Sequence, residues 1–158
     1  MYASHGAGHV AAREKRTHNG TRQEVIVLAL ADGLTVELSI KRAQELLRPL
    51  ASEADIARVQ AALRGDRVVS ADPWLRRRKD AQEKLKEGGP VELAEIIRDG
   101  AQRALTAAAA RKGAQVSQTE KEHLRKARRL LASEIALARR LELAEAEAWI
   151  ETQLEGTG

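Results

Sequence analysis

The stretch Asn19–Ile40, NGTRQEVIVLALADGLTVELSI, decides the fold class of the first part of the chain. Its two hairpin signals, Asn19-Gly20 and Asp32-Gly33, favour tight turns between antiparallel strands. Between these turns, Val25–Leu30 is a continuous apolar run of strand length. After the second turn, apolar and polar residues alternate from Leu34 to Ile40, which indicates a strand with one buried face. With a weaker strand candidate just before the first turn, the pattern predicts a small three-stranded antiparallel sheet or barrel-like module.

The period of the apolar residues becomes helical after this stretch. Two capping patterns, Ser52–Asp55 and Ser117–Glu120, each place a serine three residues before a carboxylate, as at the start of a helix. Pro90 suits the first turn of another helix. The sequence therefore predicts an α+β chain. A small antiparallel β module over residues 1–48 is followed by a compact all-helical domain over residues 49–158.

The composition excludes several classes of function. The 158 residues include no Cys, so disulfides, thiol chemistry and Cys-based metal sites are excluded. Glu120 and His123 have the spacing of one half of a di-iron site, but the chain has no second copy. Phosphate-binding loops, nucleophile elbows, apolar runs of membrane-spanning length and a signal peptide's apolar core are all absent from the sequence. We therefore expect a monomeric cytoplasmic protein without membrane contact, cofactor, metal or enzymatic activity.

The stretch from Asp72 to Lys79, DPWLRRRK, has the clearest functional content. Asp72 is a good N-cap and Pro73 suits the first helical position, so Trp74 is predicted to lie at a helix start beside a run of cations. A large apolar ring next to phosphate-seeking charges suits DNA minor-groove contact, in which a wedge enters a base step. The alternative interpretation is a tryptophan that anchors the helix by packing, with the cations paired on a solvated helix face.

Charge is unevenly distributed along the chain, whose net charge is +4. Trp74–Lys86 has six Lys or Arg against two Asp or Glu, and Arg111–Arg129 has seven against two. Glu134–Gly158 has two against six. Two basic segments before an acidic end indicate an anionic partner for one part of the surface.

A series of short stretches recurs in a familiar order over nearly the whole chain. They are Tyr2 with His5-Gly6, Arg16-Thr17, Leu34-Thr35-Val36, Trp74-x-Arg76-Arg77-x-Lys79, Glu83-Lys84-Leu85, Ala94–Asp99, Ser117-x-x-Glu120-Lys121, Ala127-Arg128 and Ser133–Ala138. In this order they resemble the CarD (CdnL) family of bacterial RNA-polymerase-binding transcription regulators, especially its actinobacterial members.

The resemblance implies a fold and a mechanism. The family has a Tudor-like N-terminal module that docks on the β subunit of RNA polymerase. Its helical C-terminal domain lies on promoter DNA at the upstream edge of the melted bubble. The family tryptophan corresponds to Trp74, which is thereby expected to wedge into the minor groove and stabilise the open complex. Arg76, Arg77 and Lys79 fall on basic positions beside it, and are expected to contact DNA.

The polymerase contact is expected on the β module, near Arg16 and on the strand that holds Thr35 and Glu37. Arg16 matches an arginine that contacts polymerase in the family. At the second such position this chain has Glu37, which reverses the charge. Family members also have a strand ahead of the Tyr2 stretch, so either the true start lies upstream of Met1 or the module lacks this strand.

Three hypotheses follow from the sequence. The first is a transcription regulator that binds RNA polymerase and promoter DNA. The second is a DNA-binding or architectural protein that acts without polymerase. The third is a protein-interaction adaptor whose basic faces meet an acidic protein.

Overall fold

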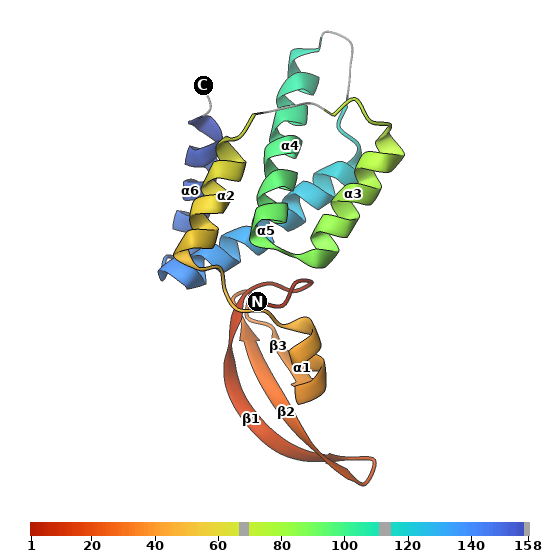
Figure 1. Cartoon of the computed structure of the whole chain (residues 1–158), viewed down its shortest axis with the longest axis vertical. Helices are drawn as coiled ribbons and strands as arrows, with labels where there is room; N and C mark the ends of the chain where they lie inside the picture. The colour runs from red at the N-terminus through yellow and green to blue at the C-terminus, as the bar shows by residue number, and fades with distance from the viewer. Residues whose placement is uncertain (67–69, 111–114, 157–158) are drawn as a thin grey trace.

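The computed structural model describes residues 1–66, 70–110 and 115–156, and its N-terminal part is an open antiparallel sheet. The strands β1 (Gly8–His18), β2 (Thr21–Leu30) and β3 (Thr35–Ser39) lie in the order β1-β2-β3. Both predicted turns are present. Asn19 and Gly20 have φ values of 49° and 77°, and Gly33 has 86°. The β1–β2 hairpin is longer than β3 and curves away from the rest of the molecule (Figure 1).

A short helix, α1 (Ile40–Leu46), follows β3 directly and packs against β2 and β3. The prediction that the third strand continues to Ile40 is wrong by one residue. The reason is that Ser39 caps the helix, since its side chain accepts the N–H of Arg42 at 3.3 Å. Leu28 and Leu30 of β2 and Ala43 of α1 are buried.

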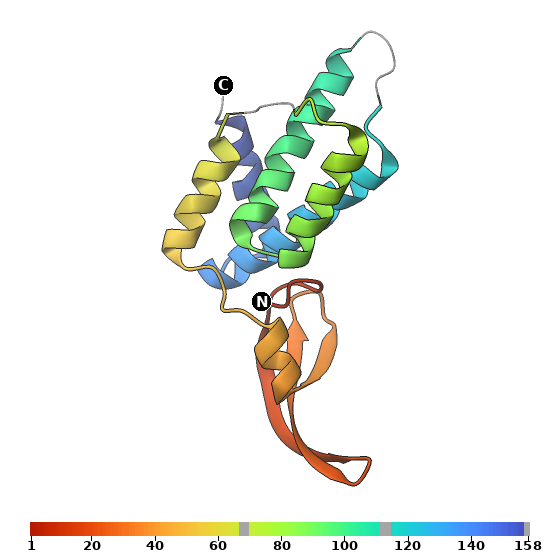
Figure 2. The ribbon, with the colours of Figure 1, turned by 45° about the vertical axis from the view of Figure 1, so that its right-hand side comes forward.

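The described residues after Ser52 form a domain of five helices. These are α2 (Glu53–Arg64), α3 (Trp74–Glu87), α4 (Pro90–Ala109), α5 (Gln118–Arg139) and α6 (Leu143–Glu155). Helices α2, α4 and α3 lie side by side, and α5 crosses behind α4 and α3 (Figures 1 and 2). The predicted α+β class, with a β module before a helical domain, is confirmed. Among the described residues, no helix combines the length and the apolar character that crossing a bilayer requires.

The centre of the helical domain is formed by α4 and α5. Leu93, Ile97, Leu130, Leu131 and Ile135 are all fully shielded from solvent. Truncation of one such residue to Ala costs about 2–5 kcal/mol of the free energy of unfolding. Trp149, in α6, is partly buried and packs against this core.

The two predicted capping boxes are present, at the starts of α2 and α5. In each, the serine hydroxyl accepts the backbone N–H three residues later and the carboxylate accepts the N–H of the serine. Because these bonds satisfy N–H groups that lack partners inside the helix, they fix where each helix begins.

Candidate nucleic-acid interface

The start of α3 lies one residue later than the sequence predicts. Pro73 occupies the N-cap position, with φ −54° and ψ 145°, and Trp74 is the first helical residue. The prediction that Asp72 caps the helix is therefore wrong. The carboxylate of Asp72 instead accepts the hydroxyl of Ser70 at 3.0 Å, and its carbonyl accepts a guanidinium N–H of Arg77 at 2.5 Å.

Trp74 is the first residue of α3 and lies against the start of α5. Its indole N–H donates to the hydroxyl of Ser117 at 3.2 Å, and the guanidinium carbon of Arg78 is 5.5 Å from the ring centroid. Yet 38% of the residue remains exposed, and the neighbouring Leu75 is 69% exposed. The ring is thus anchored at its polar edge without being part of the core.

The hydroxyl of Ser117 has its full set of hydrogen bonds. It accepts from the backbone N–H of Glu120 and from the indole of Trp74, and it donates to the carboxylate of Glu120 at 2.9 Å. A hydroxyl offers one donor and two acceptor sites, so no site remains for a competing partner. The cap of α5 therefore also sets the position of Trp74. The sequence predicted Ser117 as a cap but gave no sign of its contact with the tryptophan 43 residues earlier.

The three cations expected beside Trp74 differ in their surroundings. The side chains of Arg76 and Lys79 are 71% and 76% exposed, and their nearest carboxylates, on Asp72 and Glu83, lie 3.9 and 4.0 Å away. The side chain of Arg77 is only 22% exposed and pairs with Glu120 at 3.3 Å. Arg76 and Lys79 are therefore accessible to an anion, whereas Arg77 joins α3 to α5.

Glu120 is the centre of a small ionic cluster behind Trp74. Arg77 and Arg103 both approach its carboxylate, at 3.3 and 3.5 Å. Burial opposes the charge of Glu120, but the bonds from Ser117 and Arg77, with the charge of Arg103, outweigh this effect and lower its pKa. Burial, helped by the charge of Arg78, lowers the pKa of the nearby His123. This shift favours the uncharged imidazole and so reduces the contribution of His123 to the basic surface.

The structure brings together two of the residues expected on the polymerase-binding face. One terminal N–H group of Arg16, in β1, lies 2.8 Å from both carboxylate oxygens of Glu37, in β3. The guanidinium also donates to Glu14 at 2.9 Å. These two pairs raise the pKa of Arg16 above its ordinary value. Thr35 is exposed at the start of β3, two residues before Glu37. The arginine is thus exposed but already paired with two carboxylates.

The family comparison agrees with this arrangement of the helical domain. The family model described as CarD, C-terminal domain, matches residues 58–151. The chain belongs to the CarD family. The matched region begins inside α2, contains all of α3, α4 and α5, and ends inside α6, so it contains Trp74 and the cations beside it. CarD proteins are transcription regulators, and this chain is a CarD-like transcription factor. The β module lies outside the matched region.

Proposed function

We propose that this CarD-family protein binds the β subunit of RNA polymerase through its sheet and stabilises the promoter open complex. In this proposal, Trp74 enters the minor groove at the upstream edge of the bubble. One observation carries it: Trp74 is anchored at its polar edge, partly exposed, and adjacent to two accessible cations, Arg76 and Lys79.

The energetics favour a wedge that acts on DNA already being opened by polymerase. Insertion of a side chain between base pairs costs a few kcal/mol of lost stacking in intact duplex. A step at the edge of a bubble has already lost part of its stacking, so entry there costs less. Two phosphate contacts, from Arg76 and Lys79, are too few for tight binding to duplex DNA at physiological salt. Attachment to polymerase raises the effective concentration of Trp74 at the promoter and removes this limitation.

The roles of the three cations are divided in this proposal. Arg76 and Lys79 contact phosphates, whereas Arg77 holds the start of α3 against α5 through Glu120 and thereby supports Trp74. Arg16, Thr35 and Glu37 form the polymerase-binding face. Because Glu37 and Glu14 partly neutralise Arg16, we expect this contact to be weaker than one made by an unpaired arginine.

A co-precipitation experiment tests the proposal as a whole. The full chain is immobilised and exposed to RNA polymerase holoenzyme alone, to a promoter fragment alone, and to both together. The proposal predicts capture of polymerase whether or not the promoter is present, and a stronger complex when it is. Capture of the promoter fragment alone, with no effect of polymerase, would support a polymerase-independent DNA-binding protein. Capture of polymerase that promoter DNA does not affect would support an adaptor.

A further inference from the structure

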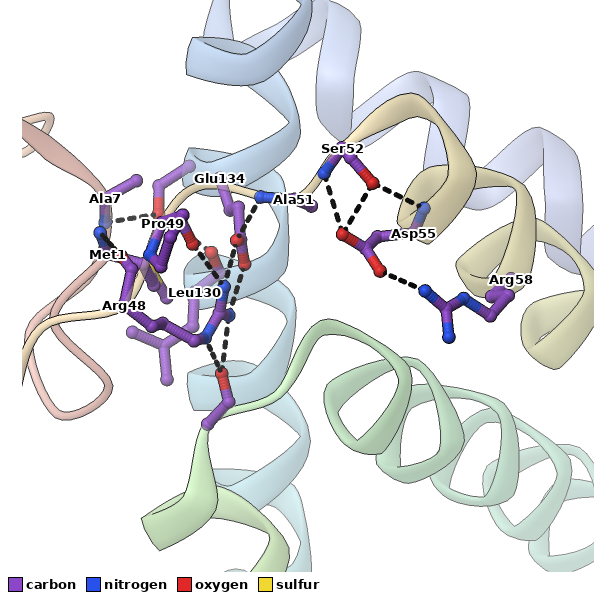
Figure 3. Close-up of polar contacts among 12 residues, drawn as sticks. Met1, Ala7, Arg48, Pro49, Ala51, Ser52, Asp55, Arg58, Leu130 and Glu134 are labelled. Carbon is purple, nitrogen blue, oxygen red and sulfur yellow. Dashed lines mark hydrogen bonds and ion pairs between the residues drawn. The ribbon is translucent and has the colours of Figure 1, made fainter.

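The junction between the β module and the helical domain contains a buried ion pair. Among the described residues, Glu134 in α5 is the one charged side chain with no exposed surface. Its carboxylate accepts two N–H groups of Arg48, at 2.5 and 2.7 Å, and the backbone N–H of Ala51 at 2.8 Å (Figure 3). A buried carboxylate is tolerated only when such bonds replace its lost hydration.

Arg48 uses all five of its N–H groups at this junction. Besides the two bonds to Glu134, its guanidinium donates twice to the carbonyl of Gly88, at 3.2 and 2.6 Å, and once to that of Pro49 at 3.0 Å. A guanidinium is planar and rigid, so five simultaneous bonds define one orientation of the group. A lysine could not reproduce this set, because its ammonium has three donors.

These bonds join three parts of the chain. Arg48 lies just after α1, at the end of the β module, while Gly88 ends α3, the helix that begins with Trp74. Glu134 lies in α5, whose first turn holds Trp74 through Ser117. The same side chain therefore connects the β module to both helices that position the tryptophan.

In the part of the chain that the structure describes, the other contacts at the junction are one long hydrogen bond, one exposed ion pair and apolar burial, none of which fixes a group through several bonds at once. The hydroxyl of Ser133 accepts the backbone N–H of Ala7 at 3.3 Å, and Ala7 and Met1 are buried against the helical core. An exposed pair joins Arg129 to Asp32 at 3.3 Å. Apolar burial favours contact between the two parts but does not by itself select one orientation. The bonds of Arg48 with Glu134 and Gly88 favour one orientation of the two parts.

We propose that Arg48 and Glu134 are positioning residues that fix the distance and orientation between the polymerase-binding face and Trp74. This inference rests on the proposed function, in which polymerase holds one end of the molecule and DNA contacts the other. A wedge tethered through a flexible junction would reach the bubble edge in only a fraction of its orientations. A fixed junction keeps Trp74 at one distance from the docking face.

Distance measurements between two spin labels test this geometry. The chain has no Cys, so Gln44→Cys in α1 and Ala148→Cys in α6, both exposed sites, give one label on each side of the junction. The inference predicts a narrow distance distribution in the otherwise unchanged chain. With Glu134→Gln, which removes the charge but keeps the size, we expect the distribution to become at least about twofold broader.

Two further variants separate loss of geometry from loss of folding. Arg48→Met combined with Glu134→Met replaces the pair by apolar groups, which proteins often tolerate without loss of stability. We expect this variant to fold and still give a broad distribution. The matched control is Glu53→Gln, which removes the charge and one acceptor oxygen from the pair with Arg139, whose two bonds of 3.2 and 2.9 Å lie within the helical domain. The control is expected to keep the narrow distribution.

Open-complex lifetime measured with the same variants tests the consequence. We expect Glu134→Gln to shorten the lifetime at least about threefold without weakening binding to polymerase, and Glu53→Gln to leave it unchanged. Distributions that stay narrow in both junction variants would overturn the inference. A broad distribution with an unchanged lifetime would overturn the positioning role. If Trp74→Ala also leaves the lifetime unchanged, the proposed function itself fails, and the label distances alone then decide whether the pair fixes the junction.

Discussion

The two candidate contact surfaces of this molecule differ in how closely their basic side chains are paired with carboxylates. At the start of α3, the side chains of Arg76 and Lys79 are more than 70% exposed. The nearest carboxylate oxygens lie 3.9 and 4.0 Å from their charged nitrogens, at the outer limit of an ion pair. On the sheet, Arg16 is held at 2.8 Å by Glu37 and also bonds to Glu14. Basic residues that the sequence alone marks as contact candidates therefore differ in how free they are to bind an anion. The surface at α3 can accept an anion as it stands, whereas the sheet must first break its own pairs.

The largest effect is expected at the tryptophan. Trp74→Ala should shorten the lifetime of the promoter open complex roughly tenfold, equal to about 1.4 kcal/mol, because stacking of an aromatic side chain on a base is worth about 1–3 kcal/mol. Since the ring is 38% exposed, the variant should fold with unchanged helical content, measured by circular dichroism. Leu105→Ala, at an exposed site on α4, serves as the control and should not change the lifetime. An unfolded Trp74→Ala protein would mean that the ring is a structural anchor.

The next largest effect is on the salt dependence of DNA binding, which should differ between the accessible cations, Arg76 and Lys79, and the paired Arg77. Arg76→Gln combined with Lys79→Gln should reduce the salt dependence of binding to a promoter fragment, lowering the slope of log affinity against log salt by about 1.8, or 0.9 for each phosphate contact. Arg77→Gln should leave this slope unchanged but lower the melting temperature, because it removes a half-buried partner of Glu120. Fluorescence anisotropy at several salt concentrations measures the slope. The opposite pattern would contradict the proposed division of roles.

A smaller effect is expected on the sheet. Glu37→Arg should strengthen binding to the polymerase β subunit roughly threefold, since an exposed ion pair is worth at most about 1 kcal/mol and its removal releases Arg16. Glu24→Arg is the matched control. It makes the same charge change on the same sheet, where Glu24 pairs with Arg13. Surface plasmon resonance with the isolated polymerase β subunit measures the affinity of both variants. Equal affinities for the two variants would show that the docking face does not include Glu37.

The smallest effect is a pH dependence of the stability contributed by Glu120, the centre of the ionic cluster next to Trp74. The pKa of Glu120 is lowered in the folded protein, so its charged form contributes stability at pH values above its ordinary pKa. This contribution is lost as the pH falls through the lowered, folded-state value. Glu120→Gln should therefore be less stable than the unchanged chain at pH 7, and this difference should shrink in acid. Urea unfolding at pH 7 and below pH 4 measures it. A difference that does not depend on pH would mean that the charge of Glu120 contributes nothing.

Local sequence signals predicted most of the fold correctly. The Asn19-Gly20 and Asp32-Gly33 turns and both serine capping boxes lie where their chemistry requires them, because each depends on residues at most a few positions apart. The errors were also local. Ile40 belongs to a helix because Ser39 caps it, and Asp72 does not cap α3 because its carboxylate bonds Ser70.

The contacts that position Trp74 and the junction join residues far apart in the sequence, so local patterns could not predict them. The bond from Trp74 to Ser117 joins residues 43 apart, and the pair of Arg48 with Glu134 joins residues 86 apart. The one available signal was a carboxylate, Glu134, inside the apolar stripe of a helix, because a charge placed there requires a buried partner. The sequence did not indicate which arginine provides it, nor that Arg77 pairs with Glu120 whereas Arg76 does not.

The most direct test of the central claim places a fluorescent base analogue, 2-aminopurine, at the upstream edge of the promoter bubble. The fluorescence of this base depends on stacking, so it reports a tryptophan that enters the adjacent step. In polymerase–promoter open complexes, the unchanged protein should alter this fluorescence and Trp74→Ala should not, although both bind polymerase equally. An identical fluorescence change with both proteins would contradict the claim that Trp74 contacts DNA at the bubble edge.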